Sequence, residues 1–132
     1  MGIVVGIDIG GSTTKIAGFD KGKMLKPVQI SANNAIASLF GAFGKFLYDN
    51  HLNLDDIQQV NLTGVGCAGV EQPIYGLPTY KVDEFTANGV GGGYFAQGKA
   101  EFMVVSMGTG TSFVGVKDGI PTHLGGIGIG GG

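Results

Sequence analysis

The feature that most restricts the fold is a pattern that occurs twice: an apolar run, a short glycine-rich turn and a second apolar run. Residues 3–9 and 13–20 flank the turn GGS, and residues 101–107 and 111–117 flank the turn GTG. Short runs that are rich in Val, Ile and Thr favour strands, because helices need longer runs. We therefore predict two hairpins, and their repetition suggests an internal duplication.

The rest of the chain alternates between helix and strand patterns, which is typical of an α/β fold. A helix is predicted over residues 33–50, where apolar side chains recur at helical spacing and Asn33 or Asn34 is the N-cap. A glycine-rich loop is expected to follow the strand at 57–63. The further predicted elements are strands at 24–31, 57–63, 79–83 and 120–124 and a helix at 84–97.

The second predicted helix contains Gly89, Gly91, Gly92 and Gly93. Each glycine costs a helix about 1 kcal/mol relative to alanine. Close packing against another backbone or a ligand is therefore the expected reason for their presence.

Composition excludes several functional classes. The formal net charge is −2, with eight lysines and no arginine, so the chain lacks the basic cluster of a nucleic-acid or anionic-membrane surface. No apolar run reaches the roughly 18–20 residues of a membrane span, and the N-terminus lacks the pattern of a signal peptide. The single cysteine, Cys67, excludes an internal disulfide and is expected to be a small buried apolar residue. A cytosolic location is the default.

The first candidate site is the stretch GIDIGGSTTK. It places Asp8 at the end of a buried strand, before a turn whose N–H groups can bind phosphate oxygens. A buried aspartate needs a partner, and water-held Mg²⁺ is the partner that a phosphate-binding hairpin supplies. Alternatively, loop amides satisfy Asp8 in an ordinary tight hairpin. The candidate phosphate ligands are Gly10, Gly11, Ser12, Thr13, Thr14 and Lys15.

The second candidate site is MGTGTS, where glycines let the backbone approach an anion and hydroxyls add donors. Its residues are Gly108, Thr109, Gly110, Thr111 and Ser112. Neither turn is a P-loop or a dinucleotide-binding fingerprint, and GGIGIGGG matches the latter by composition alone.

Five motifs together, GIDIGGSTTKI, LTGVG, DEFTANG, VVSMGTGTS and GGIGIGGG, resemble the superfamily of acetate and sugar kinases, Hsp70 and actin (ASKHA). Within it they are similar to the type II pantothenate kinases. The resemblance implies two similar lobes, each a mixed sheet with helices, that close on ATP. Residues 1–100 would be the N-terminal lobe, and residues 101–132 would be the start of the second.

The resemblance also implies roles for single residues and for partners. Glu84 matches the family's catalytic glutamate. Asp8, the second candidate catalytic residue, forms the first phosphate element with the turn at 10–15, where Lys15 matches the family's lysine. The reaction would be ATP-dependent phosphorylation of pantothenate, in a homodimer that acyl-CoA inhibits by feedback. Gly130, Gly131 and Gly132 would border the nucleotide, while His123, Gly125 and Gly126 would contact the substrate.

The role of Glu84 also has an independent argument. Phosphoryl transfer needs one group that orients or deprotonates the acceptor hydroxyl, and Glu84 lies at a predicted strand-to-helix junction. Asp83 is an alternative base. Either carboxylate could instead serve only as a helix N-terminal charge that the helix dipole favours.

Two departures from the family weaken the assignment of the substrate. The family has an arginine where this chain has His123, and imidazole does not reproduce the bidentate grip of arginine on a carboxylate. Family members also continue for more than a hundred residues after the glycines.

These departures leave alternatives open. One is another ASKHA kinase, although the cysteine-rich zinc motif of the ROK type is absent. Another is an activator ATPase for acyl-CoA dehydratases, a class that uses two cysteines per subunit at a shared iron–sulfur cluster. The third is a non-catalytic fragment that binds nucleotide or phosphate.

Overall fold

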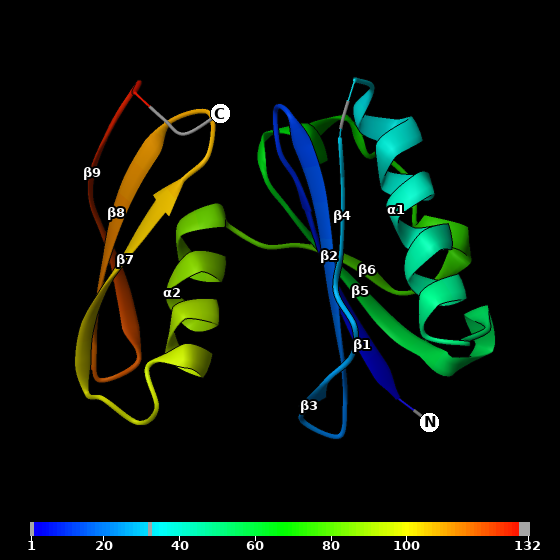
Figure 1. Ribbon diagram of the computed structural model, residues 1–132, viewed down its shortest axis with the longest axis horizontal. Coiled ribbons are helices and arrows are strands. Elements are labelled where there is room, and N and C mark those ends of the chain that lie inside the picture. The colour runs from blue at the N-terminus through cyan, green and yellow to red at the C-terminus, as the bar shows by residue number, and fades with distance from the viewer. Residues whose placement is uncertain (1, 32, 130–132) are drawn as a thin grey trace. The chain divides into compact units, whose positions relative to one another are not determined.

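The opening hairpin lies at the centre of a mixed sheet. The computed structural model describes residues 2–31 and 33–129. Strand β1 (Ile3–Ile9) pairs antiparallel with β2 (Thr13–Asp20) and parallel with β5 (Ile57–Thr63), as Figure 1 shows. The sheet order is β3-β2-β1-β5-β6, and β4 also pairs with β2. The outer strands are β3 (Lys23–Met24), β4 (Val28–Ser31) and β6 (Thr79–Lys81).

Helix α1 (Ala35–Asp49) covers one face of this sheet (Figure 1). The side chain of Asn34 caps it by accepting a hydrogen bond from the backbone N–H of Ala37 at 2.9 Å, so Asn34 and not Asn33 is the cap. Alternate residues of β1 are buried because a strand turns successive side chains to opposite faces. They form the core with the apolar face of α1, and the largest buried side chains there are Phe43, Phe46, Ile7, Ile9 and Leu39.

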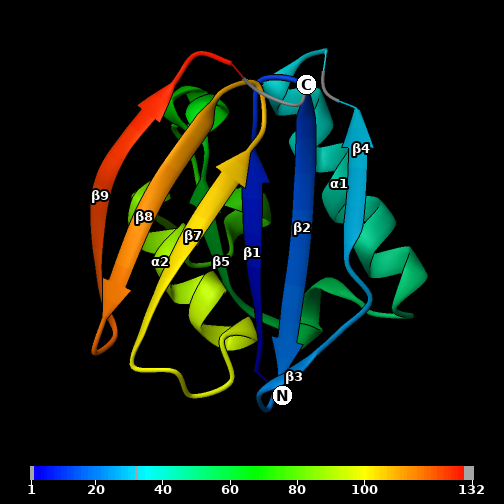
Figure 2. The same cartoon turned by 60° about the vertical axis from the view of Figure 1, so that its left-hand side comes forward.

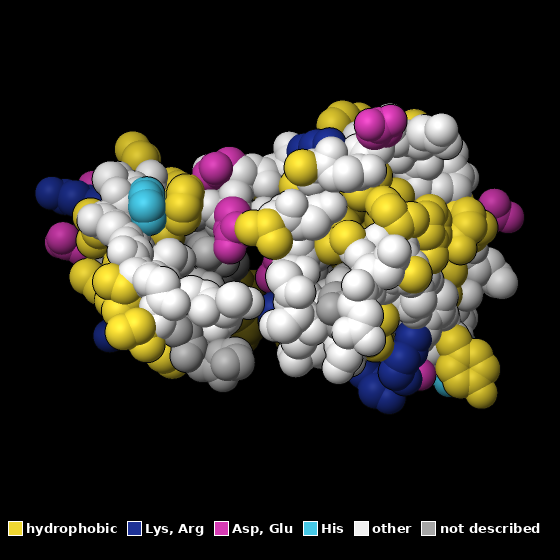
Figure 3. All heavy atoms as spheres, turned by 90° about the horizontal axis from the view of Figure 1, so that it is seen from above, with side chains coloured by type: hydrophobic (Ala, Val, Ile, Leu, Met, Phe, Trp, Pro, Cys, Tyr) yellow, Lys and Arg dark blue, Asp and Glu magenta, His cyan; other side chains and the backbone are white. Residues whose placement is uncertain are grey.

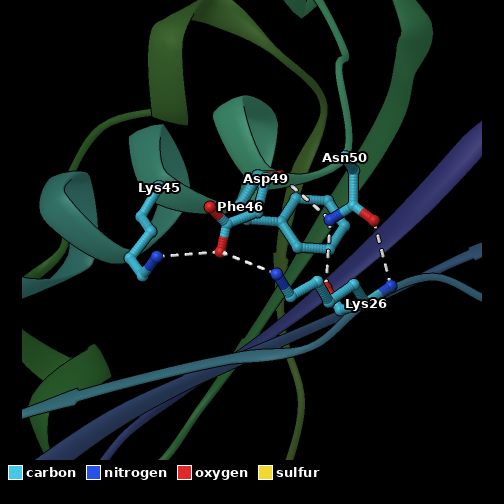
Figure 4. A network of polar contacts seen from close by, with 5 residues as sticks. All are labelled: Lys26, Lys45, Phe46, Asp49 and Asn50. Carbon is cyan, nitrogen blue, oxygen red and sulfur yellow. Dashed lines mark hydrogen bonds and ion pairs between the residues drawn. The ribbon is translucent and has the colours of Figure 1, made fainter.

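A polar network ties the end of α1 to the segment after β3 (Figure 4). The side chain of Asn50 accepts from the backbone N–H of Lys26 and donates to the carbonyls of Lys26 and Phe46, each at 3.0 Å. Asp49 accepts a 2.8 Å hydrogen bond from Lys45 and lies 3.8 Å from the amine of Lys26. The hydrogen bond from Lys45, with the nearby positive charges, lowers the pKa of Asp49 although partial burial opposes this.

The same network explains one wrong prediction. A single strand over residues 24–31 is replaced by β3 and β4, with Leu25, Lys26 and Pro27 between them. The backbone of Lys26 bonds to Asn50 instead of a neighbouring strand, and Pro27 has no N–H to donate to a ladder.

Short 3₁₀ turns connect the remaining elements of this part of the chain. Residues 64–70, expected as a loop, contain the turn η2 (Val65–Gly69), where Cys67 is half-buried against the core. The other two turns are η1 (Leu54–Asp56) and η3 (Ile74–Gly76).

The chain divides into two compact units, Met1–Lys81 and Val82–Gly132. The second contains α2 (Glu84–Phe95) and an antiparallel sheet of β7 (Glu101–Met107), β8 (Thr111–Lys117) and β9 (Ile120–Ile127), which Figure 2 shows with α2 behind it. The two compact units divide after Lys81, because α2 packs on this sheet, and the predicted lobe boundary at residue 100 stays a prediction.

Two glycines explain how closely α2 approaches its sheet. A Cβ atom at Gly89 would overlap Pro121, and one at Gly92 would overlap Val104. The expectation that some glycines of this helix serve close packing is confirmed, and the partner is the side chains of the sheet.

The hairpins of the two units share their turn geometry. Lys21 and Gly22 between β2 and β3 have φ of 49° and 80°, and Asp118 and Gly119 between β8 and β9 have φ of 50° and 78°. Two consecutive left-handed residues are the mark of a type I′ hairpin turn. Since each unit also has a glycine-rich turn after its first strand, the structure supports the predicted duplication.

The surface carries no large patch of one charge on the side seen in Figure 3, where Lys, Asp and Glu side chains lie in small separate groups. Among the described residues, no helix combines the length and the apolar character needed to cross a membrane.

Candidate functional site

Asp8 lies near the end of β1, between two neighbouring strands. Its register partners are Lys15 on β2 and Thr63 on β5. The amine of Lys15 lies 3.4 Å from Oδ2 of Asp8, and the two side chains are 49% and 39% exposed. An ion pair this accessible contributes about 1 kcal/mol or less. The partner that the aspartate required is thus Lys15, and the pair is weak enough for a phosphate or a cation to replace it.

Gly64 holds the backbone against the carboxylate of Asp8. A Cβ atom at this position would collide with Oδ1 of Asp8 and with the carbonyl oxygen of Ile9, and its φ of 89° also favours glycine. The neighbouring Thr63 has a buried Oγ1 without a hydrogen-bond partner among the described residues. Both residues were missed as site residues, and only the glycine-rich motif LTGVG hinted at them.

The turn after β1 offers donors to an anion. The N–H of Gly10 closes the turn by donating to the carbonyl of Thr13 at 2.9 Å. Gly11 and Ser12 are exposed, and within the described part of the chain their N–H groups donate to no backbone carbonyl. These two N–H groups and the hydroxyl of Ser12 can therefore bind a phosphate oxygen.

Thr14 does not fit its predicted role. It lies on the core face of β2 together with Ile16 and is fully buried, and its Oγ1 has no partner in the described structure. Residues two apart on a strand share a face, so the hydroxyl of Thr14 points into the core, away from the surface that a phosphate would reach.

The residues around Asp8 fit a magnesium ion that arrives with a nucleotide. Within residues 2–31 and 33–129, no three His, Cys, Asp or Glu side chains gather to hold a metal by themselves. Mg²⁺ normally keeps several waters and uses one or two carboxylates together with substrate phosphates. Asp8 supplies one accessible carboxylate, and the unpartnered Oγ1 of Thr63 is next to it in register.

The turn after β7 is the corresponding element of the second unit. The N–H of Gly108 donates to the carbonyl of Gly110 at 2.9 Å, while Thr109 is exposed at the tip. The hydroxyl of Thr111 donates to the carbonyl of Ile129 at 2.6 Å. The proton of Thr111 is therefore already used, and Thr109 is the freer donor.

Strand β9 brings the predicted substrate glycines beside this turn. Gly126 pairs with Ser112, and Gly125 pairs with Phe113 where the register shifts. The closest atoms to a Cβ at Gly126 would belong to Thr111 and Ser112. Gly130, Gly131 and Gly132, predicted to border the nucleotide, lie outside the described residues.

The N-terminus of α2 distinguishes between the two candidate bases. Oδ2 of Asp83 accepts hydrogen bonds from the backbone N–H of Thr86 at 3.0 Å and from its hydroxyl at 3.2 Å. Asp83 therefore serves as the N-cap. Glu84 is exposed, and its carboxylate has no hydrogen bond or ion pair within the described residues. Of the two, only Glu84 takes no part in capping the helix.

An aromatic contact connects the start of α2 with His123. The ring of Phe85 stacks on the imidazole with centroids 3.8 Å apart and an interplanar angle of 18°. The structure thus brings His123 next to the helical turn that carries Glu84. Phe85 was missed because no local pattern marks a contact between a helix and a strand 38 positions later.

No protein-family model and no curated protein matches this chain. Among solved structures, it is similar to component A of the (R)-2-hydroxyglutaryl-CoA dehydratase of Acidaminococcus fermentans, with a TM-score of 0.79, 17% identity and 92% of this chain covered. The activator of the 2-hydroxyisocaproyl-CoA dehydratase of Clostridium difficile with bound ADPNP gives a TM-score of 0.76, with 16% identity and 95% coverage. The ROK hexokinase of Thermus thermophilus gives 0.61, with 16% identity and 90% coverage.

These likenesses show the fold of the chain, an α/β fold with a mixed sheet. This confirms the predicted fold class, a mixed sheet with flanking helices and a second hairpin unit. The chain spans about half of these proteins, namely 46%, 44% and 47% of their lengths. They are a dehydratase component, a dehydratase activator and a hexokinase, so the comparisons show the fold and do not point to pantothenate.

Proposed function

We propose that the protein transfers the γ-phosphoryl group of ATP to an alcohol, and that the alcohol is pantothenate. The observation that carries this proposal is the state of the two carboxylates at the start of α2. Asp83 is used as the helix cap, whereas Glu84 is exposed and unpartnered within the described residues. The ASKHA fold and the resemblance of the sequence motifs to pantothenate kinases support the same reaction.

The two glycine-rich turns would bind the phosphates of ATP. In the first unit, the N–H groups of Gly11 and Ser12 donate to phosphate oxygens, and Lys15 exchanges Asp8 for a phosphate. In the second unit, Thr109 adds donors from the tip of its turn. Asp8, released from Lys15, would hold Mg²⁺, which when bound neutralises charge on the phosphates.

Glu84 would act on the acceptor. Its carboxylate accepts the proton of the acceptor hydroxyl while that oxygen forms a bond to the γ-phosphorus and the bond to the leaving ADP oxygen breaks. The imidazole of His123 would donate to the carboxylate of pantothenate. Because imidazole offers one donor to that carboxylate where arginine offers two, we expect weaker acceptor binding than in enzymes with arginine.

A coupled ADP-release assay with pantothenate tests this proposal, on these 132 residues and on the protein in its full natural length. Glu84→Gln should lower turnover by roughly 10²–10⁴-fold and leave ATP binding nearly unchanged. Glu101→Gln, which changes an exposed carboxylate of the same unit, is the matched control and should have no effect. Wild-type turnover of Glu84→Gln would remove this residue from the role of base, and a folded full-length protein without pantothenate-dependent ADP release would refute the proposal.

A second candidate, an activator ATPase, is favoured by the TM-scores of 0.79 with the dehydratase component and 0.76 with the dehydratase activator. These 132 residues contain one cysteine, whereas two per subunit are expected of that class. ATP hydrolysis that does not depend on pantothenate, together with bound iron in anaerobically purified protein, would favour the activator over the kinase.

A further inference from the structure

Phe85 and His123 form a close aromatic contact within the second unit. The ring centroids are 3.8 Å apart at an interplanar angle of 18°. Phe85 is half-buried and His123 is exposed. A nearly parallel contact of this kind covers one face of the imidazole, and both nitrogens lie on the edge of the ring, outside the stacked face.

The imidazole has no polar partner among the described residues. Its nitrogens form no hydrogen bond or ion pair with the part of the chain that the structure describes. An exposed side chain on a strand otherwise exchanges between rotamers. The ring of Phe85 therefore sets the plane of the imidazole, and the direction in which its N–H can donate follows from that plane.

The backbone of Phe85 lies in the capped first turn of α2. Phe85 is the second residue of α2, directly after Glu84, and the cap at Asp83 fixes this first turn through two hydrogen bonds to Thr86. The turn of helix that presents the candidate base therefore also holds the candidate anion donor.

We propose that Phe85 is a positioning residue for acceptor recognition. Its ring holds the imidazole of His123 in place to donate to the carboxylate of the acceptor, while Glu84 on the same turn faces the hydroxyl. The inference rests on the proposed function for the identity of the acceptor. It goes beyond that function by making acceptor affinity depend on a side chain that itself touches neither ATP nor the reacting atoms.

Nuclear magnetic resonance of the two histidines, His51 and His123, tests the inference without any turnover. In the wild type, the ring current of Phe85 should displace the ring-proton signals of His123 relative to those of the exposed His51. Addition of pantothenate should shift the signals of His123 in a saturable manner and leave those of His51 unchanged. Unresponsive His123 signals would overturn the inference.

Substitutions at Phe85 give the quantitative test. Phe85→Leu should remove the ring-current displacement and weaken pantothenate binding by about threefold to tenfold. Phe85→Tyr, which keeps an aromatic ring, should keep both the displacement and the wild-type affinity. Phe85→Met also removes the ring, with little loss of apolar volume, and replaces Phe85→Leu in the binding test if the leucine variant does not fold. Phe95→Leu is the matched control, because Phe95 lies at the other end of α2 and is 69% exposed. Wild-type affinity in a folded Phe85→Leu or Phe85→Met protein would contradict the inference.

Kinetics separate this inference from the proposed function. In an active protein, Phe85→Leu should raise the KM for pantothenate and leave kcat and the KM for ATP within about twofold. ADP release with a KM that does not depend on Phe85 would keep the kinase and overturn the positioning role. If the protein binds pantothenate in a manner that depends on Phe85 but never releases ADP, the positioning role is supported and the kinase reaction is refuted.

Discussion

The glycines of α2 allow a sharp test of how this helix packs, because two of them differ only in their surroundings. A Cβ atom at Gly89 would overlap Pro121 and lie 3.3 Å from a methyl group of Val116, whereas a Cβ atom at Gly91 would meet nothing within 4 Å. Both positions lie inside the helix. Alanine at either one should therefore gain the same helix propensity, about 1 kcal/mol.

The overlap decides the difference between the two variants. Gly91→Ala should raise the free energy of unfolding by about 1 kcal/mol. In Gly89→Ala, the same gain is opposed by overpacking against a rigid proline ring, which typically costs about 1–3 kcal/mol. The net change at Gly89 then runs from about zero to a loss of about 2 kcal/mol, and the gap between the variants, about 1–3 kcal/mol, measures the overlap alone.

Hydrogen exchange of the β8 amides is the appropriate assay, because the two units need not unfold together. The amides of Val114 and Val116 lie in the buried middle of the second unit and report its opening free energy. Far-UV circular dichroism in urea supplies the global value. Equal stabilisation by both alanines would show that Gly89 does not pack as described, and the placement of α2 on its sheet would then be wrong.

Three further predictions concern the first unit. Asn34→Ala removes the cap of α1 and should lower the free energy of unfolding by about 0.5–2 kcal/mol in urea titrations; an unchanged value would show that the cap hydrogen bond is not stabilising. Because its folded-state pKa is lowered, mainly by the hydrogen bond from Lys45, Asp49 contributes stability that is present above the usual pKa of 3.8 and is lost as the pH falls through the folded value. Lys45→Met should therefore reduce the loss of stability between about pH 5 and pH 2, measured by urea unfolding at each pH, and an identical acid profile would contradict this. Gly64→Ala forces a side chain into the space beside Asp8 at a φ of 89° and should weaken Mg²⁺–ATP binding by at least about tenfold in calorimetry; wild-type affinity would remove Asp8 from the nucleotide site.

The strands of both hairpins were predicted with their observed bounds, for instance residues 101–107 and 111–117. They could be predicted because apolar runs and glycine turns are local signals. The break of the strand at Pro27 was missed, although a proline inside a strand pattern is itself a warning. What splits that strand is the backbone of Lys26, which bonds to Asn50 some 24 positions away.

The candidate site also combines residues that the sequence indicated with roles that only the structure changed. The sequence indicated Asp8, the two turns and Glu84, but it counted Thr14 among the phosphate ligands and left Asp83 open as a base. Burial of Thr14 in the core and use of Asp83 as a cap changed both assignments.

The sequence by itself determined the α/β alternation, the two glycine-rich hairpins and the candidate groups for phosphate and proton chemistry. Residue type and spacing set these through local backbone preferences. Only the tertiary structure decided that α2 belongs to the second unit, that Gly64 packs against Asp8 and that Phe85 stacks on His123. Each of these depends on contacts between residues far apart in the chain, and no local pattern records which distant side chain will fill a given space.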